Sequence, residues 1–336
     1  MNGNLSVIIV NYQSAGVIED CINSAIQFPN AEKYEWIIVD NNSEDGSEHQ
    51  LKDKFPFIKW INMDYNAGFA RGNNAGIKYS SNNTILLLNP DMIILNDAIN
   101  QCMARFSVSV AVASSVQLLY KNGSSQITGS YFVKGGLNTI FFLPYLGSLV
   151  KSIYAIFKKQ STAIKTATAN QKVDWINGAF MMVKKNAIEK AGMFDEDFFL
   201  YAEEVEWCSR LKKAGEIVVF GDITSIHLQG SSINSATATV DETYFNIYDK
   251  KGLQLLVSRY LRIKKQFGKN WFLFHMIIIG IEIPIYIICS FFDNLLRFKN
   301  PFADVEKIKA YTRNVFLVWK LAPKVISGTP YFYKMF

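Results

Sequence analysis

The feature that most constrains the fold is a run of four aliphatic residues that ends abruptly in a polar turn. Residues 85–88, Ile-Leu-Leu-Leu, form an uninterrupted apolar run with the length of a strand that is buried on both faces. The run stops at Asn89-Pro90-Asp91, because proline cannot continue a central strand. Strands of this kind occur in parallel sheets covered by helices, and ligands bind such sheets at the carboxyl ends of the strands. We therefore expect an α/β fold with a ligand site near Asp91.

Similar apolar runs precede this one along the first part of the chain. Runs at 5–10, 36–39 and 57–61 predict three earlier strands, and helical spacing of apolar residues follows the first of them. A fifth strand is expected over residues 108–113, with a hairpin around Asn122-Gly123 after it. Strands that alternate with helices build βαβ units. The pattern predicts a Rossmann-like, mostly parallel central sheet flanked by helices.

Polar residues stand at the ends of successive strands, where they favour a nucleotide site. Asn11 follows the first strand and Asp40 the second, and a carboxylate there can accept hydrogen bonds from a base or a ribose. The glycine-rich segment 68–76 lets the backbone approach a ligand closely, and its Arg71 could meet phosphate charge. Helix capping and tight turns are the alternative for each residue taken singly. Neither GxGxxG after the first strand nor GxxxxGK(S/T) occurs, which excludes the dinucleotide fingerprint and the P-loop.

The Asn89-Pro90-Asp91 turn is also suited to a cation. Hard oxygen ligands at the edge of such a sheet can hold Mg²⁺ or Mn²⁺ against a diphosphate. A plain strand-to-helix turn is the alternative. His227 stands between two apolar residues and is a second ligand candidate, with a purely structural histidine as the alternative.

Val205, Cys208 and Leu211 mark the buried stripe of an expected helix that Gly215 closes, and the first turn of this helix is acidic. Glu206 and Arg210 are four residues apart in the favourable order for an ion pair, which gives Glu206 a structural role. Glu203 and Glu204 have no such partner at that spacing, and the helix dipole favours their ionised form. One of them could act as a general base that takes a hydroxyl proton. Complementing the helix dipole is the alternative.

Charge and cysteine usage narrow the class of protein and its compartment. The 336 residues carry 35 basic and 29 acidic side chains, a net charge of +6, and the excess is concentrated in the last third. This distribution favours an anionic membrane surface or a phosphate-bearing substrate, and no nucleic-acid-binding module is recognisable. The four scattered cysteines suit a reducing compartment. No signal peptide is recognisable, so we expect the chain to begin in the cytoplasm.

Two apolar segments lie outside the pattern of strands. Residues 130–172 resemble an inserted amphipathic segment with a mobile tail, and a helix packed on the sheet is the alternative. Residues 271–292 are long enough to span a bilayer, but Glu282 interrupts them and basic residues flank both ends. We expect them to lie in or dip into the cytoplasmic leaflet, with burial in a homo-oligomer as the alternative. The expected domains are 1–235 and a helical, membrane-associating 236–336.

These motifs together resemble the family 2 inverting glycosyltransferases, which have the GT-A fold. The subgroup resembled is that of the bacterial rhamnosyltransferase-like enzymes of surface-polysaccharide assembly. The resemblance covers residues 4–235, with the motifs in the family order. It is carried by residues 10–12, 39–43, 66–74, 88–91, 175–179 and 194–201 and by His227.

The resemblance implies a donor, an acceptor and a cation. The donor would be a nucleoside-diphosphate sugar, such as a dTDP- or UDP-sugar, and the acceptor a glycan or a polyprenyl-diphosphate-linked saccharide. Mg²⁺ or Mn²⁺ would be held by Asp91 and His227, with Asn89 where many members carry a first Asp. The protein would be a peripheral or monotopic membrane protein that acts at the cytoplasmic face of the bacterial inner membrane.

The resemblance also implies roles for individual residues. Glu204 would be the base by position, although many members carry Asp there, and Glu203 is a possible substitute. The donor-binding residues would be Asn11, Asp40, Asn42, Gly68, Arg71, Asn73, Asn89 and Trp175.

Two other functions are weighed against this one. A sugar-phosphate nucleotidyltransferase would need a glycine-rich loop with Arg and Lys directly after the first strand, where residues 11–14 read Asn-Tyr-Gln-Ser. A non-catalytic nucleotide-sugar-binding membrane subunit would have no use for Glu203, Glu204, Asp91 and His227, and their presence argues against it.

Overall fold

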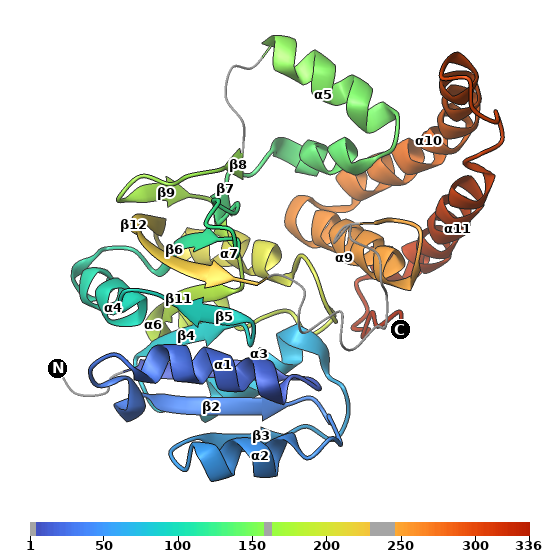
Figure 1. Ribbon diagram of the computed structural model, residues 1–336. Coiled ribbons are helices and arrows are strands. Elements are labelled where there is room, and N and C mark those ends of the chain that lie inside the picture. Colours follow the sequence, from blue (N-terminus) through green and yellow to red (C-terminus); the bar gives the residue numbers. More distant parts are fainter. Residues whose placement is uncertain (1–4, 158–162, 229–245) are drawn as a thin grey trace. The chain divides into compact units, whose positions relative to one another are not determined.

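A computed structural model of the chain describes residues 5–157, 163–228 and 246–336 (Figure 1). The predicted domain boundary at 235/236 and residues 158–162 of the predicted mobile tail lie outside the described residues. The chain groups into two units. The first consists of Met1–Tyr131, Ala163–Phe199 and Glu203–Glu242, and the second of Phe132–Thr162, Leu200–Ala202 and Thr243–Phe336.

A nine-stranded mixed sheet forms the centre of the first unit (Figure 1). Its strand order is β3-β2-β1-β4-β11-β6-β12-β5, with β9 paired to β12. The strands β1 to β4 pair in parallel, and β11 runs antiparallel between β4 and β6. The expected GT-A class of sheet is confirmed, although it is mixed. The strands are β1 (Leu5–Asn11), β2 (Glu35–Asp40), β3 (Lys59–Asn62), β4 (Thr84–Leu88), β5 (Met92–Ile94), β6 (Ala113–Leu119), β9 (Gln171–Val173), β11 (Phe180–Lys184) and β12 (Ile217–His227).

The core lies on both faces of this sheet. Ile85, Leu86 and Leu87 of β4 have no exposed surface, which confirms that the aliphatic run is a strand buried on both sides. A small three-stranded sheet accompanies it, formed by β7 (Gly129–Ser130), β8 (Ala163–Ile164) and β10 (Trp175–Ile176). The helices of this unit are α1 (Ala15–Ile26), η1 (Ala31–Lys33), α2 (Ser47–Lys54), α3 (Gly68–Tyr79), α4 (Ala98–Val108), α6 (Lys185–Ala191) and α7 (Glu203–Ala214).

The strand predicted over residues 108–113 is wrong. Helix α4 continues to Val108, and β6 begins only at Ala113. Val108 and Val110 expose 86% and 82% of their surface, so their alternation reflects an outward-facing connection rather than a buried strand. The hairpin predicted after it is confirmed, because Tyr120 N donates to Ser124 O at 2.8 Å.

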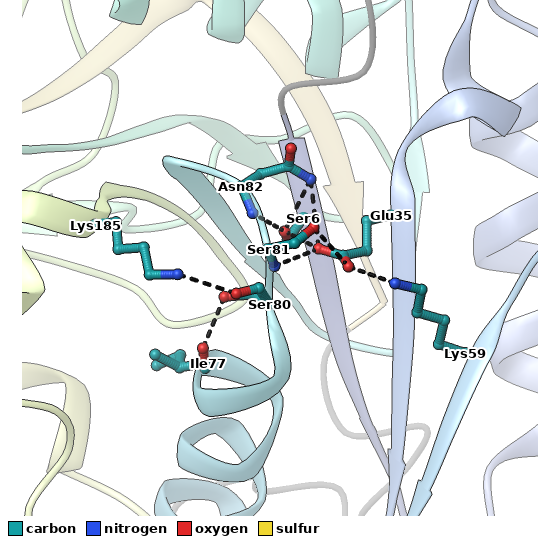
Figure 2. A network of polar contacts seen from close by, with 8 residues as sticks. All are labelled: Ser6, Glu35, Lys59, Ile77, Ser80, Ser81, Asn82 and Lys185. Carbon is teal, nitrogen blue, oxygen red and sulfur yellow. Dashed lines mark hydrogen bonds and ion pairs between the residues drawn. The ribbon is translucent and has the colours of Figure 1, made fainter.

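A polar network joins the amino ends of the first strands, at the edge opposite the carboxyl ends of β1 and β4 (Figure 2). Glu35 of β2 accepts hydrogen bonds from Ser6 of β1, from Lys59 of β3 and from Ser81, which precedes β4. Burial alone would raise the pKa of Glu35, but these three partners lower it to about 2. The carboxylate therefore ties four strand ends together and helps fix where β4 begins.

The second unit is helical. Its buried polar groups join α10 to the segment before α5: His275 Nε2 lies 2.9 Å from Gly135 O, and Glu282 accepts from Tyr145 N at 2.7 Å. Residues 134–157 of the predicted insertion thus belong to the same unit as the C-terminal helices. The helices are η2 (Lys134–Phe142), α5 (Leu146–Phe157), α9 (Lys250–Phe267), α10 (Lys269–Leu296) and α11 (Val305–Ser327).

Candidate active site

The turn after β4 brings Asp91 close to His227. Asp91 is 2% exposed, and the next residue, Met92, begins β5. Strand β5 pairs antiparallel with the end of β12 in a register that sets Met92 opposite His227. The Nε2 atom of His227 lies 3.3 Å from Oδ1 of Asp91. Two residues far apart in the sequence therefore meet because β5 and β12 are neighbours in the sheet.

Gln126 holds the imidazole ring of His227 in place. The Nε2 amide of Gln126 donates to the backbone carbonyl of His227 at 2.6 Å, which leaves its Oε1 as the atom facing Nδ1 of the ring at 3.1 Å. Because Oε1 can only accept, Nδ1 carries the proton in the neutral ring. The lone pair of Nε2 then points towards Asp91 and Asn89.

The side chains around His227 fit a divalent cation. The Oδ1 atom of Asn89 is buried and has no hydrogen-bond partner among the described residues, and Nδ2 of Asn89 lies 3.5 Å from Nε2 of His227. A carboxylate, an amide oxygen and an imidazole nitrogen are suitable ligands for Mg²⁺ or Mn²⁺. Within residues 5–157, 163–228 and 246–336 no cluster of three His, Cys, Asp or Glu residues is found. Phosphate oxygens and water would have to complete the coordination.

Glu203 and Glu204 begin α7, as expected, but their surroundings differ. Glu203 is 4% exposed, and its Oε2 atom has no partner in the described part of the chain. Burial, together with the charge of Glu204, raises the pKa of Glu203 well above its ordinary value. Desolvation thus opposes the ionised form that the helix dipole favours, and for Glu203 the effect of desolvation is the larger of the two. Glu204 is half-buried.

A short loop connects the surroundings of Glu204 to the turn after β4. A Cβ atom added at Gly178 would lie 3.6 Å from Cβ of Glu204. The neighbouring Ala179 accepts a hydrogen bond from Asn89 N at 2.9 Å through its backbone carbonyl. Glu204 and Asn89 thus contact adjacent residues of one loop, at the start of β11. This loop was predicted as a site motif, but the sequence did not show that it joins the two sets of residues.

The ends of β1 and β2 form a second polar cluster. Asn11 Nδ2 donates to Asp40 Oδ1 at 2.6 Å and to the hydroxyl of Ser43 at 3.1 Å. Ser43 N donates to the other carboxylate oxygen of Asp40 at 2.9 Å. All three residues are buried. The hydroxyl of Ser43 also donates to Oδ1 of Asp40, so the carboxylate is fixed at the carboxyl end of β2 and a lone pair of Oδ2 remains for a ligand.

The predicted site residues of α3 have partners within the first unit. Arg71 Nε donates to Glu196 O at 2.9 Å, and Asn73 Nδ2 donates to Phe69 O at 2.9 Å. At Gly68 the backbone φ is 73°, and an added Cβ would lie 2.3 Å from Phe199 O. This glycine therefore permits a close approach to Phe199. Contact of these three residues with a donor stays a prediction.

Asn42 and Trp175 lie in different surroundings from one another. Asn42 has a left-handed backbone with φ of 60°, and its side-chain amide donates to Glu44 at 3.1 Å. Trp175 belongs to β10, where it pairs with Ser130 of β7, and its side chain is half-buried. Their proposed role in donor binding also stays a prediction.

The sheet and its polar edge define the class of protein. A mixed sheet flanked by helices, with the turn after β4 beside the histidine that ends β12, is the arrangement of a GT-A transferase. The family model described as "Glycosyl transferase family 2" matches residues 6–190. The chain belongs to this family.

Three known proteins illustrate the similarity. The low-salt glycan biosynthesis hexosyltransferase Agl10 of Haloferax volcanii is 29% identical over 218 residues, which is 63% of each chain. The rhamnosyltransferase WbbL of Escherichia coli K12 is 25% identical over 205 residues, covering 59% of this chain and 74% of WbbL. The mannosyltransferase PcManGT from Pyrobaculum calidifontis, solved with GDP-Man and Mn²⁺, aligns with a TM-score of 0.53 at 12% identity, over 94% of this chain and 87% of its own.

Proposed function

We propose that the protein is an inverting glycosyltransferase that moves a sugar from a nucleoside-diphosphate donor to a hydroxyl of a lipid-linked saccharide. The observation that carries this proposal is the meeting of Asp91, His227 and Asn89 beside the loop that contacts Glu204. Family membership supports the reaction class, and the relatives that act in glycan synthesis support a role in bacterial surface polysaccharide. A rhamnosyl donor is the specific form that the similarity to WbbL supports.

The chemistry would be a single displacement at the anomeric carbon. The carboxylate of Glu204 takes the proton of the acceptor hydroxyl while that oxygen forms its bond to the anomeric carbon. The bond from this carbon to the diphosphate oxygen breaks on the opposite face, so the configuration inverts. A positioned base is worth 10²–10⁴-fold in rate, or about 3–5 kcal/mol of barrier. Burial, together with the charge of Glu204, raises the pKa of Glu203 well above its ordinary value and so disfavours its carboxylate form, which makes Glu203 less suited than Glu204 to be the base.

The donor would be bound through its nucleotide and its diphosphate. Asp40, held by Asn11, would accept hydrogen bonds from the base or ribose. Asp91, His227 and Asn89 would hold Mg²⁺ or Mn²⁺, as the donor set at the turn suggests. The bound cation supplies Lewis-acid stabilisation of the negative charge that develops on the departing diphosphate.

The location proposed is the cytoplasmic face of the inner membrane, with α10 lying in the interface. In the part of the chain that the structure describes, α10 is the one helix long and apolar enough to cross a membrane. Yet α11 packs along it through Trp319, whose Nε1 donates to Met276 O at 3.1 Å, and α11 carries Lys309 and Arg313. Carrying both helices through a bilayer would place these charges in hydrocarbon. A helix that lies in the interface avoids this cost.

The apolar surface of α10 supports the same location. Its polar side chains His275, Glu282 and Asn294 are buried within the second unit. Past Lys269 and Asn270 at its start, its exposed side chains are, apart from Pro284, large and apolar, as an interfacial helix requires. They are Leu273, Phe274, Ile277, Ile281, Ile287, Ile288, Phe292, Leu295 and Leu296.

The proposal is tested by a transfer assay on the full chain. The purified protein is incubated with UDP-, dTDP- and GDP-sugars, a lipid-diphosphate-linked saccharide, and Mn²⁺, Mg²⁺ or a chelator. We expect one donor to release nucleoside diphosphate together with a glycosylated lipid of inverted anomeric configuration, dependent on the metal. Glu204→Gln should lower the rate 10²–10⁴-fold, and the exposed Glu189→Gln should not. Donor binding without transfer or hydrolysis would instead favour a non-catalytic subunit.

A further inference from the structure

Arg259 of α9 has an unusual environment for an arginine. Its guanidinium carbon lies 3.7 Å from the centre of the Phe142 ring of η2, close enough for a stacked cation–π contact. Among the described residues, its N–H groups have no hydrogen-bond acceptor and no carboxylate partner. Arg259 is half-buried, and Phe142 is 49% exposed. A stacked guanidinium still presents five donors in the plane of the fork, so it can bind an anion edge-on.

Basic side chains outnumber acidic ones in the described part of the unit that contains Arg259. Residues 246–336 contain 15 Lys and Arg but only five Asp and Glu, and residues 132–157 add two lysines and no acid. Each of the five carboxylates is engaged elsewhere: Asp249 with Gly252 N, Glu282 with Tyr145 N, Asp293 with Arg297, Asp304 with Asn294 and Glu306 with Lys309. None of these five described carboxylates contacts Arg259, so an external anion is the natural counter-charge for its guanidinium.

Arg262, one turn further along α9, adds to the positive potential. It is 7% exposed, and it donates to Gln266 Oε1 at 2.7 Å and to Thr139 Oγ1 at 3.4 Å. Burial, together with the charge of Arg262, lowers the pKa of Arg259 to about 10, although the nearby Tyr260 opposes this shift. A lowered pKa indicates that the cation is poorly solvated and would be stabilised by an anion.

We propose that Arg259, stacked on Phe142, binds a phosphate group of the lipid-linked acceptor. Phosphate suits the guanidinium fork, because two parallel N–H bonds can reach two of its oxygens. An apolar tail suits the same unit, because Leu149 and Ile153 of α5, which follows η2, are exposed. This assignment rests on the proposed function for the identity of the acceptor. It adds the residue that recognises the phosphate.

Binding can be measured without turnover. Farnesyl diphosphate, a soluble isoprenoid diphosphate, is titrated into the full chain by calorimetry, and Arg259→Gln, Arg259→Lys and Arg313→Gln are compared with the native protein. Arg313 is an exposed arginine of the same unit and serves as the matched control. We expect Arg259→Gln to weaken binding about 10- to 100-fold, since a charge-assisted hydrogen bond is lost. The affinity of Arg259→Lys for farnesyl diphosphate should lie between those of Arg259→Gln and the native protein, and the affinity of Arg313→Gln should match that of the native protein.

Three further measurements distinguish a lipid-linked diphosphate from free diphosphate and from membrane phospholipid, and they test whether the variants fold. Inorganic diphosphate should bind more weakly than farnesyl diphosphate, and binding of farnesol should not depend on Arg259. Vesicles of phosphatidylglycerol should bind native protein and Arg259→Gln equally. The thermal unfolding midpoint of Arg259→Lys shows whether the stack on Phe142 persists. Equal binding of farnesyl diphosphate by native protein and a folded Arg259→Gln variant would overturn the assignment. The assignment would also be overturned if Arg259→Gln lost only its binding to phosphatidylglycerol vesicles. The same holds if inorganic diphosphate bound the native protein as tightly as farnesyl diphosphate does.

The assignment and the proposed function fail in different experiments. If no sugar is transferred by the native protein but farnesyl diphosphate binding depends on Arg259, the transferase proposal fails and the site stands. If transfer occurs, Arg259→Gln should raise KM for the diphosphate-linked acceptor about 10- to 100-fold with KM for the donor unchanged. An alkyl glycoside acceptor that lacks phosphate should be used equally by both proteins.

Discussion

The Nε2 atom of His227 lies 3.3 Å from Oδ1 of Asp91, while Gln126 holds the opposite nitrogen of the same ring. Gln126 accepts a hydrogen bond from the proton on Nδ1 of the neutral ring and so orients it, which leaves the lone pair of Nε2 facing Asp91. The ring is therefore oriented before any ligand binds. Such preorganisation lowers the cost of binding a cation between Asp91 and His227.

Replacing Gln126 should weaken metal binding without removing a proposed ligand. Gln126→Ala frees the ring of His227 to rotate or change tautomer, and loss of such a supporting hydrogen bond typically costs 10–100-fold in metal affinity or activity. We expect the Mn²⁺ concentration that gives half-maximal activity to rise by about that factor. The exposed Gln101→Ala is the matched control. An unchanged Mn²⁺ dependence in a folded Gln126→Ala protein would contradict the assigned orientation.

Glu203 and Glu204 should respond differently to neutral isosteres. The raised pKa of Glu203 means that it is protonated in the folded protein at pH values where the unfolded chain is ionised. Stability contributed by Glu203 therefore falls as the pH rises above its ordinary value of 4.5. Glu203→Gln should remove this fall, raise the unfolding midpoint at pH 7 to 8, and keep most activity. A 10²-fold or larger loss of activity in Glu203→Gln would make Glu203 the base instead.

Local sequence patterns predicted the structure correctly where the interactions that determine it lie close together in the chain. The aliphatic run before Asn89 predicted β4, and the spacing of Glu206 and Arg210 predicted their ion pair, which is 2.7 Å long. The direction of β11 could not be predicted, because an apolar run such as 180–183 is equally buried whether it runs parallel or antiparallel to its neighbours. Direction depends on the path of the chain between strands.

The site shows the same division between local and distant causes. Asp91 and His227 were predicted from motifs, whereas Gln126 carries no signal, since its role arises only when the hairpin after β6 meets the end of β12. For Glu203 the sequence indicated the helix dipole, which acts within one turn. It did not indicate the burial that raises the pKa, because that burial comes from the packing of α7.

The exposed apolar face of α10 predicts the behaviour of charged variants. Ile277→Asp combined with Ile288→Asp places two carboxylates on surfaces that are 61% and 57% exposed, so folding should be little affected. Binding to anionic vesicles should fall sharply, because each charge must be dehydrated at the interface. Val108→Asp with Val110→Asp alters two apolar residues of the first unit that are even more exposed, at 86% and 82%, and should leave vesicle binding unchanged. Cosedimentation measures both pairs.

Glu35 predicts a pH dependence of stability of the opposite sign to that of Glu203. Its pKa is lowered from 4.5 in the unfolded chain to about 2 in the network of Figure 2. The stabilisation is therefore complete above pH 4.5 and is lost as the pH falls towards 2. Glu35→Gln should lower the free energy of unfolding by about 2–3 kcal/mol at pH 7, with the difference shrinking in acid. Urea unfolding at several pH values measures this. A difference that is independent of pH would show that lost packing, not ionisation, is responsible.

A substitution at Gly68 should affect both stability and activity, because Gly68 lies against Phe199, which precedes helix α7 in the chain. Gly68→Ala would bring a Cβ atom to 2.3 Å from Phe199 O at a φ of 73°, so both overpacking and left-handed strain oppose it. We expect a loss of about 3 kcal/mol or more in the free energy of unfolding. Gly16→Ala, in an exposed turn of α1 with no atom within 4 Å, should be neutral or stabilising by up to about 1 kcal/mol.

Because Phe69 N also donates to Phe199 O at 2.9 Å, shortly before Glu203 in the chain, activity of Gly68→Ala should fall even below its unfolding temperature. Full activity at that temperature would mean that the position of Phe199 does not affect α7.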